Sequence, residues 1–364
     1  MATTVRSVTL QSFNYFSRPQ TGGIRNEPIK APCAWVGSEL MATPEAFTVT
    51  LDGTQVEEVK AAVRRVAESG KAPPTLTAAD FKWPLLLPLL ASIKEELLAG
   101  LGFKLVRGFP VEDWSDRERE LFFVGWGMHL GICGAQDNDG AILGVVTDTG
   151  ADPKVERQYK TRAAIDFHCD AADAVGLLCV HASESGGESM LVSSATAYNR
   201  FLEQHPKKVK TLYTPFLLDV RGTGGIHCVP IEPVRHGADG RVRTFWHSEY
   251  YRSCYGKAGA PAAMPKEQRE AYEAYIAIIH DPSMAVRMTL RPGDVQMCSN
   301  HTIVHARAAY DDTAASKRKL LRLWLSMDEE GRSWSDAASK ANHVALVASR
   351  FVRAKVFARL GLSW

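Results

Sequence analysis

Residues 167–173 read FHCDAAD, and much later in the chain residues 300–307 read NHTIVHAR. Side chains at positions i and i+2 of a β-strand point to the same side, so on a strand His168 and Asp170 would converge while Cys169 faces away. His305 can add a second imidazole. Two imidazoles and one carboxylate can occupy one face of a metal ion and leave its other positions open. The sequence therefore predicts a metal centre formed by His168, Asp170 and His305 on a strand-rich fold.

A second histidine, His301, competes with His305 for the third ligand position. The two lie four residues apart, so they would share one face of a strand that began early enough. His305 lies inside the apolar, strand-like run 303–309, whereas His301 precedes that run. We expect His305 to be the ligand and His301 to be a turn residue that supports the ligands.

The composition is that of an ordinary globular protein. Of the 364 residues, 45% are hydrophobic and 23% are charged, which is enough apolar material for a large core. Lys and Arg number 43 against 41 Asp and Glu, so the formal net charge of +2 provides no general attraction to nucleic acid or to an anionic membrane. The apolar run at 84–90 is short and broken by prolines, far from membrane-spanning length. We expect a small-molecule substrate, no nucleic-acid partner and no membrane partner. The composition does not decide whether the chain forms a homo-oligomer.

The cysteine pattern bears on the compartment. Seven cysteines are scattered along the chain and none forms a C-x-x-C pair, so neither a zinc ribbon nor a disulfide framework is predicted. The first residues, MATTVR, lack a basic region followed by an apolar stretch, so we see no secretory signal. We therefore expect a cytoplasmic protein in a reducing compartment.

The chain is predicted to form one catalytic domain over residues 1–364. Its parts are an extended arm (1–50), a mainly helical part (51–130), a β-rich core (131–330) with an insertion or lid (210–265), and a helical C-terminal tail (331–364). Helices followed by many short strands favour an α+β, mainly β fold. The architecture that fits this order best is a jelly roll or double-stranded β-helix, cupin-like, with flanking helices.

Local patterns give the expected elements. Helices begin at two sequences of the capping-box form, Thr54-x-x-Glu57 and Ser115-x-x-Glu118. Further helices are expected at 89–99, 195–204 and 266–279. Short runs rich in β-branched residues and bounded by turns predict strands at 103–107, 142–147, 174–180, 189–192, 286–290, 295–298, 303–309 and 320–326.

Three more motifs accompany the histidines and the aspartate. They are GGES at 186–189, RPGD at 291–294 and RKLLRLWL at 318–325. With these motifs in this order, the chain resembles the TauD/TfdA family of Fe(II)/2-oxoglutarate-dependent dioxygenases over about residues 103–325. The resemblance implies a distorted double-stranded β-helix. It also implies an enzyme that uses Fe(II), 2-oxoglutarate and O2 to oxidise, most simply to hydroxylate, an unactivated C–H bond of a small organic molecule, with release of succinate and CO2.

The resemblance also assigns roles to individual residues. It implies that His168, Asp170 and His305 bind iron, that Arg318 pairs with the distal carboxylate of 2-oxoglutarate and that Ser189 assists it. Arg322 would lie near the reaction centre and hold an acidic group. A planar guanidinium suits these roles, because it donates two parallel hydrogen bonds to a carboxylate and stays charged. A protein carboxylate, such as Asp311 or Asp312, is the alternative partner of Arg322.

The substrate contacts are less constrained. The candidates are Gln136, Asn138, Tyr159 and Trp246, and Trp246 fits a core residue as well as it fits a lid. Arg322 favours a small carboxylate, sulfonate or amino acid, whereas the 210–265 insertion would suit a larger natural product. Two other readings of the same residues are a metal-dependent hydrolase and a non-catalytic, cupin-like binding protein.

Overall fold

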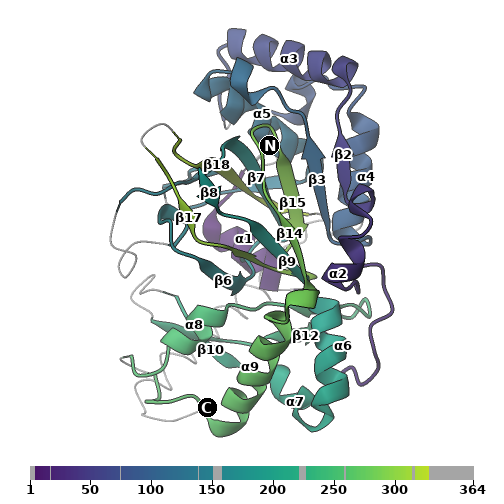
Figure 1. Ribbon diagram of the computed structural model, residues 1–364, viewed down its shortest axis with the longest axis vertical. Coiled ribbons are helices and arrows are strands. Elements are labelled where there is room, and N and C mark those ends of the chain that lie inside the picture. The colour runs from purple at the N-terminus through teal and green to yellow at the C-terminus, as the bar shows by residue number, and fades with distance from the viewer. Residues whose placement is uncertain are drawn as a thin grey trace, which may run out of the picture.

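The computed structural model describes residues 5–16, 18–73, 75–137, 139–150, 158–220, 227–257, 260–313 and 316–327. Strands from distant parts of the chain form a central β-rich core, and helices lie at its two ends (Figure 1). The predicted combination of a mainly β core with flanking helices is therefore observed. The expected helical tail at 331–364 lies outside the described residues.

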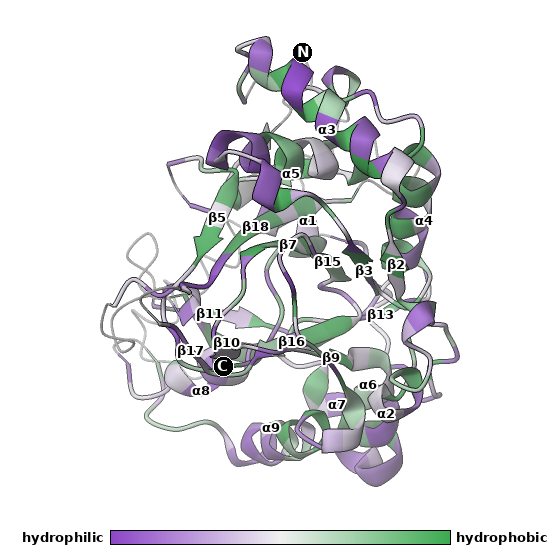
Figure 2. Ribbon diagram, turned by 45° about the horizontal axis from the view of Figure 1, so that its top comes forward, coloured by the Kyte–Doolittle hydropathy of each residue, from purple (hydrophilic) through white to green (hydrophobic). Residues whose placement is uncertain are grey.

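The larger sheet has eight strands. Along the sheet the order is β1 (Val5–Arg6), β4 (Ile132–Gly134), β18 (Lys319–Ser326), β7 (Ala174–His181), β15 (Val295–Ser299), β3 (Phe103–Arg107) and β2 (Thr48–Thr50), and β5 (Leu143–Val146) also pairs with β18. Helices α3 (Gly53–Glu68), α4 (Leu87–Leu98) and α5 (Asp116–Leu130) pack at one end, where they share a core cluster with this sheet. Helix α3 is amphipathic and buries Val59, Ala62, Val63 and Val66, so its outer face is hydrophilic in Figure 2.

The smaller sheet has four antiparallel strands. Their order is β14 (Ala285–Met288), β9 (Ser189–Ser193), β16 (Ile303–Arg307) and β6 (Ile165–His168). Its outer side packs on α6 (Ser194–Gln204), α7 (Val209–Leu212) and α9 (Lys266–Ile279), and two hairpins and α8 (Ser248–Ser253) complete this layer. The hairpins are β10 (Phe216–Asp219) with β11 (Cys228–Ile231), and β12 (Val234–His236) with β13 (Val242–Thr244).

A third core cluster joins the two sheets. Phe103, Val175 and Cys298 come from the larger sheet, and Leu191 and Ile303 come from the smaller one. All five side chains are buried. Because both sheets present alternate residues to this interior, the remaining inward-facing positions are free to carry polar side chains around a cavity.

Most of the expected elements are present. The strand at 103–107 and the helix at 266–279 agree to the residue, and the other strands agree within a few residues of their ends. The capping box Ser115–Glu118 is confirmed, but the one at Thr54 and Glu57 is wrong. Asp52 is the N-cap residue of α3 and Gln55 completes the box, because the Asp52 carboxylate accepts from the backbone N–H groups of Thr54 and Gln55.

The extended arm predicted for residues 1–50 is wrong over its first part. Helix α1 (Val8–Phe16) and strand β1 lie within the fold, and Tyr15 is fully buried. Asn14 and Arg18 both bind Asp173, at 2.9 Å each. Local composition gave no hint of this packing, because Asp173 is far away in the sequence.

No disulfide framework was predicted from the sequence, but the structure contains a disulfide. Cys228 of β11 and Cys254, at the end of α8, form a disulfide with their Cα atoms 6.0 Å apart. The packing of α8 on the β10–β11 hairpin brings the two cysteines together. Their spacing of 26 residues in the sequence matches no motif that would have predicted the pair. The cytoplasmic location, which rested on the cysteine pattern, stays a prediction.

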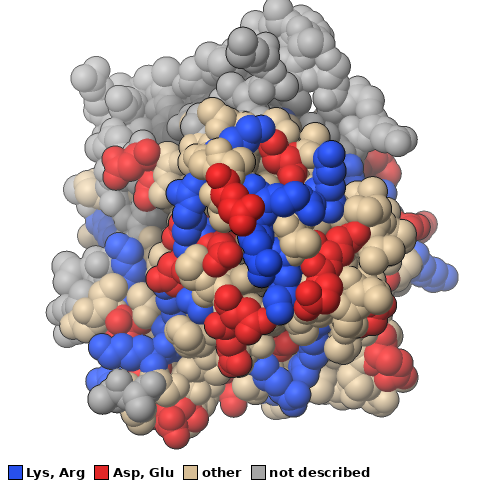
Figure 3. All heavy atoms as spheres, turned by 90° about the horizontal axis from the view of Figure 1, so that it is seen from above, with Lys and Arg blue, Asp and Glu red and all other residues tan. Residues whose placement is uncertain are grey.

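Opposite charges alternate on the end of the molecule formed by α3 and α5 (Figure 3). Lys60 lies 2.9 Å from Asp113, and Asp116 pairs with both Arg119 and Lys319. This face therefore presents no field of a single sign. Among the described residues, none of the helices is long and apolar enough to cross a membrane.

We expect Asp173→Ala to lower the free energy of unfolding by about 3–5 kcal/mol, because it removes the buried carboxylate that pairs with the guanidinium of Arg18. The carboxylate of Asp173 also binds His301 and the backbone N–H of Met327, so one substitution removes several buried contacts. Urea-induced unfolding measures the change. As the control, Asp113→Ala removes a carboxylate whose side chain is 57% exposed and should cost at most about 1 kcal/mol. Equal losses in the two variants would contradict the role of Asp173.

Candidate active site

A cavity lies between the two sheets. The smaller sheet contributes His168, Ser189 and His305 to its lining, and the larger sheet contributes Gln296 and Arg322. Segments far apart in the sequence thus present polar groups to one cavity. Such a concave site with a few converging polar side chains is typical of small-molecule binding.

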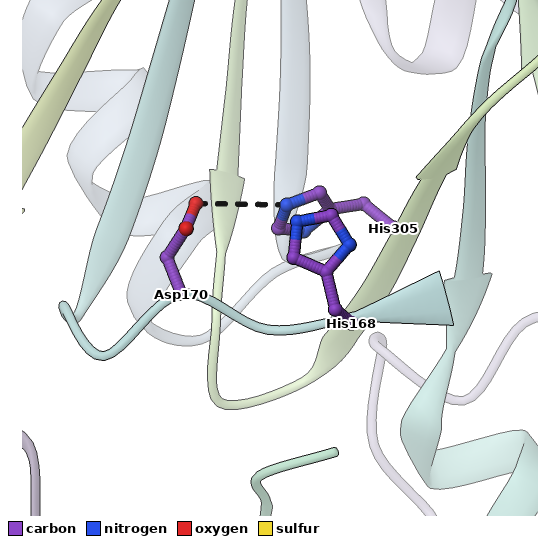
Figure 4. A group of neighbouring side chains, drawn as sticks. All are labelled: His168, Asp170 and His305. Atoms are coloured by element: carbon purple, nitrogen blue, oxygen red, sulfur yellow. Dashed lines mark ion pairs between the residues drawn. The ribbon is translucent and has the colours of Figure 1, made fainter. Parts of the chain in front are cut away.

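His168, Asp170 and His305 form one group in this cavity (Figure 4). One ligand atom of each residue lies within 4.8 Å of those of the other two, and His305 Nε2 is 3.6 Å from Asp170 Oδ2. His305 and His168 are direct partners across β16 and β6. Asp170 Oδ2 is buried and has no hydrogen-bond partner among the described residues. A metal ion would satisfy this oxygen, and two nitrogens with one oxygen suit Fe(II), so the residues fit the ion.

The ionisation states also suit metal binding. His168 Nδ1 lies 2.9 Å from the Asp166 carbonyl and can donate to it, which leaves Nε2 as the ligand atom. Burial, together with the neighbouring His305, lowers the pKa of His168 to about 4, so this imidazole is neutral at pH 7. Burial by itself would raise the pKa of Asp170, but Arg322 and His305 outweigh it and hold that pKa well below its usual range.

Asp170 is positioned by Asn300 and not by a strand. Strand β6 ends at His168, so the same-side argument for positions i and i+2 does not describe the backbone at Asp170. Instead, the Asn300 side chain accepts from the Asp170 N–H at 3.0 Å and donates to the Ala172 carbonyl at 2.9 Å. Cys169 faces away into the second core cluster, as expected. In the sequence, Asn300 stands out only as part of the motif at 300–307.

His301 does not join the metal group. Its Nε2 lies 2.8 Å from Asp173 Oδ1, and its ring stacks on Tyr15 with centroids 4.4 Å apart. The structure thus groups His305 with the other two candidate ligands and leaves His301 in the buried network that holds α1.

Arg318 and Ser189 both line the cavity. Arg318 is buried, donates from Nη2 to the Gly187 carbonyl at 3.2 Å, and keeps an Nη1 with no hydrogen-bond partner among the described residues. Gly187 has φ +75°, and a Cβ there would lie 3.2 Å from Arg318 Nε. Glycine therefore gives the turn its shape and leaves room for the guanidinium.

Arg322 lies between two aromatic rings and close to the metal group. Its guanidinium carbon is 4.5 Å from the ring centroids of Tyr159 and Trp324. Nε donates to Gln136 Oε1 at 2.9 Å, and Nη1 is 3.8 Å from Asp170 Oδ1. The carboxylate closest to Arg322 is thus that of Asp170, a candidate metal ligand. Of the two alternatives raised from the sequence, Asp311 and Asp312, the latter accepts a hydrogen bond from the backbone N–H of Arg318.

The four residues predicted to contact the substrate lie in different places in the structure. Tyr159 lines the cavity, whereas Gln136 is buried behind Arg322. Asn138 lies outside the described residues. Trp246 is fully buried and lies away from the cavity lining, because its ring packs against Tyr272 and Tyr275 in the second core cluster. The core interpretation of Trp246 therefore replaces its role as a substrate contact.

Arg307 is a cavity residue that sequence analysis did not single out. It is buried, donates from Nη2 to the carbonyls of Thr161 (2.8 Å) and Ala163, and packs over Tyr310 at 4.8 Å. Burial and the like charge of Arg318 lower its pKa to about 10. The available signal was its position two residues after His305, which puts both side chains on one face of β16.

Residues 68–324 match the family described as "Taurine catabolism dioxygenase TauD, TfdA family". The chain belongs to this family. It is 27% identical over 328 residues to FR-33289 synthase of Streptomyces rubellomurinus, covering 87% of this chain and 95% of the relative. It is 28% identical to a taurine hydroxylase-like protein, SAT17, of Stachybotrys chartarum, covering 82% and 79% of the two chains.

Solved structures share the fold at low identity. Asparagine oxygenase in complex with Fe(II), 3-hydroxyasparagine and succinate superposes with a TM-score of 0.60 at 17% identity, over 77% of this chain and 93% of that one. The non-heme iron oxygenase OrfP with Fe and α-ketoglutaric acid gives 0.59 at 15% identity, over 77% and 94%. With its family shown, the protein is an Fe(II)/2-oxoglutarate-dependent dioxygenase, which confirms the enzyme class and its cofactors.

We expect His305→Ala to lose Fe(II) binding while keeping the fold, because one of three ligands is removed from a preformed site. Anaerobic Fe(II) titration followed by calorimetry gives the stoichiometry and affinity. His301→Ala is the matched control four residues away: it should bind Fe(II) normally but unfold more easily. Normal iron binding by His305→Ala would exclude this residue as a ligand.

Proposed function

We propose that this TauD/TfdA-family enzyme hydroxylates an unactivated C–H bond of a small anionic molecule, releasing succinate and CO2. In this proposal His168, Asp170 and His305 bind the iron, and Arg318 with Ser189 binds the distal carboxylate of 2-oxoglutarate. The facing sheets would form the distorted double-stranded β-helix of one catalytic domain. The observation that carries the proposal is the excess of guanidinium groups around the metal group.

The charge in the cavity favours an anionic substrate. Arg307, Arg318 and Arg322 line it together with a single carboxylate, that of Asp170. Fe(II) would add two positive charges and 2-oxoglutarate would remove two, so the occupied cavity still carries two net positive charges. A buried charge without a partner is costly, and a substrate with a carboxylate, sulfonate or phosphate group removes that cost.

The comparisons support the same class of substrate. A relative from Amycolatopsis, 27% identical over 173 residues, is named uridine-5'-phosphate dioxygenase, and asparagine oxygenase was solved with a hydroxylated amino acid. The 210–265 insertion, which had suggested a larger natural product, gives little support to that reading. Its described residues pack as two hairpins and α8 on the second core cluster, and none of them lines the cavity.

The protein's own residues bind and orient the reactants. Bound Fe(II) supplies the activation of O2 that is coupled to decarboxylation of the 2-oxo acid. Arg318 would bind the distal carboxylate of that acid and so orient it within the cavity that also contains the candidate iron ligands. Arg322 would pair with an anionic group of the substrate close to Asp170. The rings of Tyr159 and Trp324 pack against the guanidinium of Arg322 and would shield this pair from water. The substrate C–H bond is thereby held near the metal.

A substrate screen tests the reaction itself. Succinate release is measured with Fe(II), 2-oxoglutarate and ascorbate in the presence of small carboxylates, sulfonates, phosphates and their neutral amides or esters. We expect release above the uncoupled background for anionic compounds only. Stimulation by the neutral analogues with no response to the anions would reject the anionic substrate class.

We expect Arg318→Ala to weaken 2-oxoglutarate binding by about 2–5 kcal/mol, or roughly thirty- to several-thousandfold, because the carboxylate loses a buried charged partner. The apparent KM for 2-oxoglutarate reports the change. Arg322→Ala, four residues further along the chain, is the comparison and should affect mainly the substrate. The reverse pattern would exchange the two roles.

We expect Arg322→Met to fold with nearly normal stability but to lose coupled turnover. Methionine keeps much of the volume and the contact with the rings while it removes the charge. Comparing succinate formed with substrate hydroxylated measures the coupling. A folded Arg322→Met enzyme with full coupled activity would show that Arg322 is structural.

A further inference from the structure

We propose that Arg307 and Tyr310 bind the distal carboxylate of 2-oxoglutarate together with Arg318 and Ser189. The co-substrate would thus be held at its far end by two guanidinium groups and two hydroxyl groups. This inference rests on the proposed function, because it extends the co-substrate site assigned there to Arg318 and Ser189.

The strand register places these residues together. Arg307 of β16 is the direct cross-strand partner of Ser189 of β9. Both line the cavity, as does Arg318, the residue directly before β18. Direct partners on antiparallel strands have Cβ atoms about 5 Å apart, so Arg307 starts beside the hydroxyl assigned to the carboxylate.

Tyr310 connects the two arginines. Its ring centroid lies 4.8 Å from the guanidinium carbon of Arg307 and 5.0 Å from that of Arg318. Strand β17 (Tyr310–Asp311) pairs with β8 (Ser185–Gly186), next to the glycine whose carbonyl binds Arg318. One aromatic ring therefore supports both cations at the same end of the cavity.

The group of residues has hydrogen-bond donors left over. Arg307 Nε and Nη1, Arg318 Nη1 and the Tyr310 hydroxyl are buried and have no hydrogen-bond partner among the described residues. No described carboxylate forms an ion pair with Arg307 or Arg318 at up to 4.0 Å. A carboxylate has about four lone-pair sites on two oxygens, so one such group can accept from several of these donors.

A purely structural Arg307 does not account for these features. Nη2 holds the carbonyls of Thr161 and Ala163, which is a structural contact. That contact leaves two further nitrogens without hydrogen-bond partners among the described residues, and the guanidinium stays beside the like charge of Arg318. An anion placed between the two arginines removes both costs.

Binding of two 2-oxo acids tests the inference. Anaerobic calorimetry on the enzyme loaded with Mn(II), which prevents turnover, gives the dissociation constants of 2-oxoglutarate and of 2-oxobutyrate, which lacks the distal carboxylate. We expect Arg307→Met to weaken 2-oxoglutarate roughly ten- to hundredfold and to leave 2-oxobutyrate unchanged. Tyr310→Phe keeps the ring and should weaken 2-oxoglutarate alone, by about two- to tenfold.

The controls separate the possible failures. Arg287→Met removes an exposed arginine of β14 and should change neither constant. Equal weakening of both acids by Arg307→Met would show a structural role and overturn the inference, as would unchanged 2-oxoglutarate binding in both Arg307→Met and Tyr310→Phe. If Arg307→Met does not fold, Tyr310→Phe decides by the same comparison. A wild-type enzyme that does not prefer 2-oxoglutarate would instead overturn the co-substrate site of the proposed function.

Discussion

The pairing of β16 with β6 is the constraint on which the site depends. It sets His305 directly opposite His168, with imidazole centroids 4.3 Å apart. Because successive side chains alternate between the faces of a sheet, a slip of one residue would turn His305 into the outer core. Between His305 and Arg307 the register shifts by one residue, so β6 has an irregularity beside the cavity. Such bulges commonly re-aim side chains near active sites.

The two sheets contribute different groups to the cavity: candidate iron ligands on one side and two of the three arginines on the other. The smaller sheet and the loop after β6 supply the candidate iron ligands, whereas β18 of the larger sheet supplies Arg322, and Arg318 directly precedes that strand. Closing the sheets on one another buries guanidinium groups that would be solvated in the unfolded chain. That burial is tolerable because Asp170, Gln136 and aromatic rings lie against them, and because anionic ligands complete the pairing.

Sequence reasoning worked where the pattern was local or the motif specific. The apolar runs at 303–309 and 320–326 predicted the strands observed as β16 and β18, and the motifs predicted polar residues that now line one cavity. It failed where two distant segments meet. The N-terminal helix docks on Asp173, Cys228 meets Cys254, and Trp246 turns into the core, each through packing that no short window records. Arg307 was overlooked because its partners, Ser189 and Tyr310, lie on other strands.

The sequence by itself determined the family, the enzyme class and a short list of candidate ligands, because residue types and spacings specify donor atoms. The tertiary structure decided which of those atoms meet. It brought His305, the ligand expected from the sequence, to the other two residues of the metal group, and it directed His301 toward Asp173 through the turn at Asn300. It also held Asp170 in a loop by a side-chain hydrogen bond from outside its own segment. Donor chemistry is a property of residues, but their convergence depends on strand register and on contacts between segments that only the folded chain brings together.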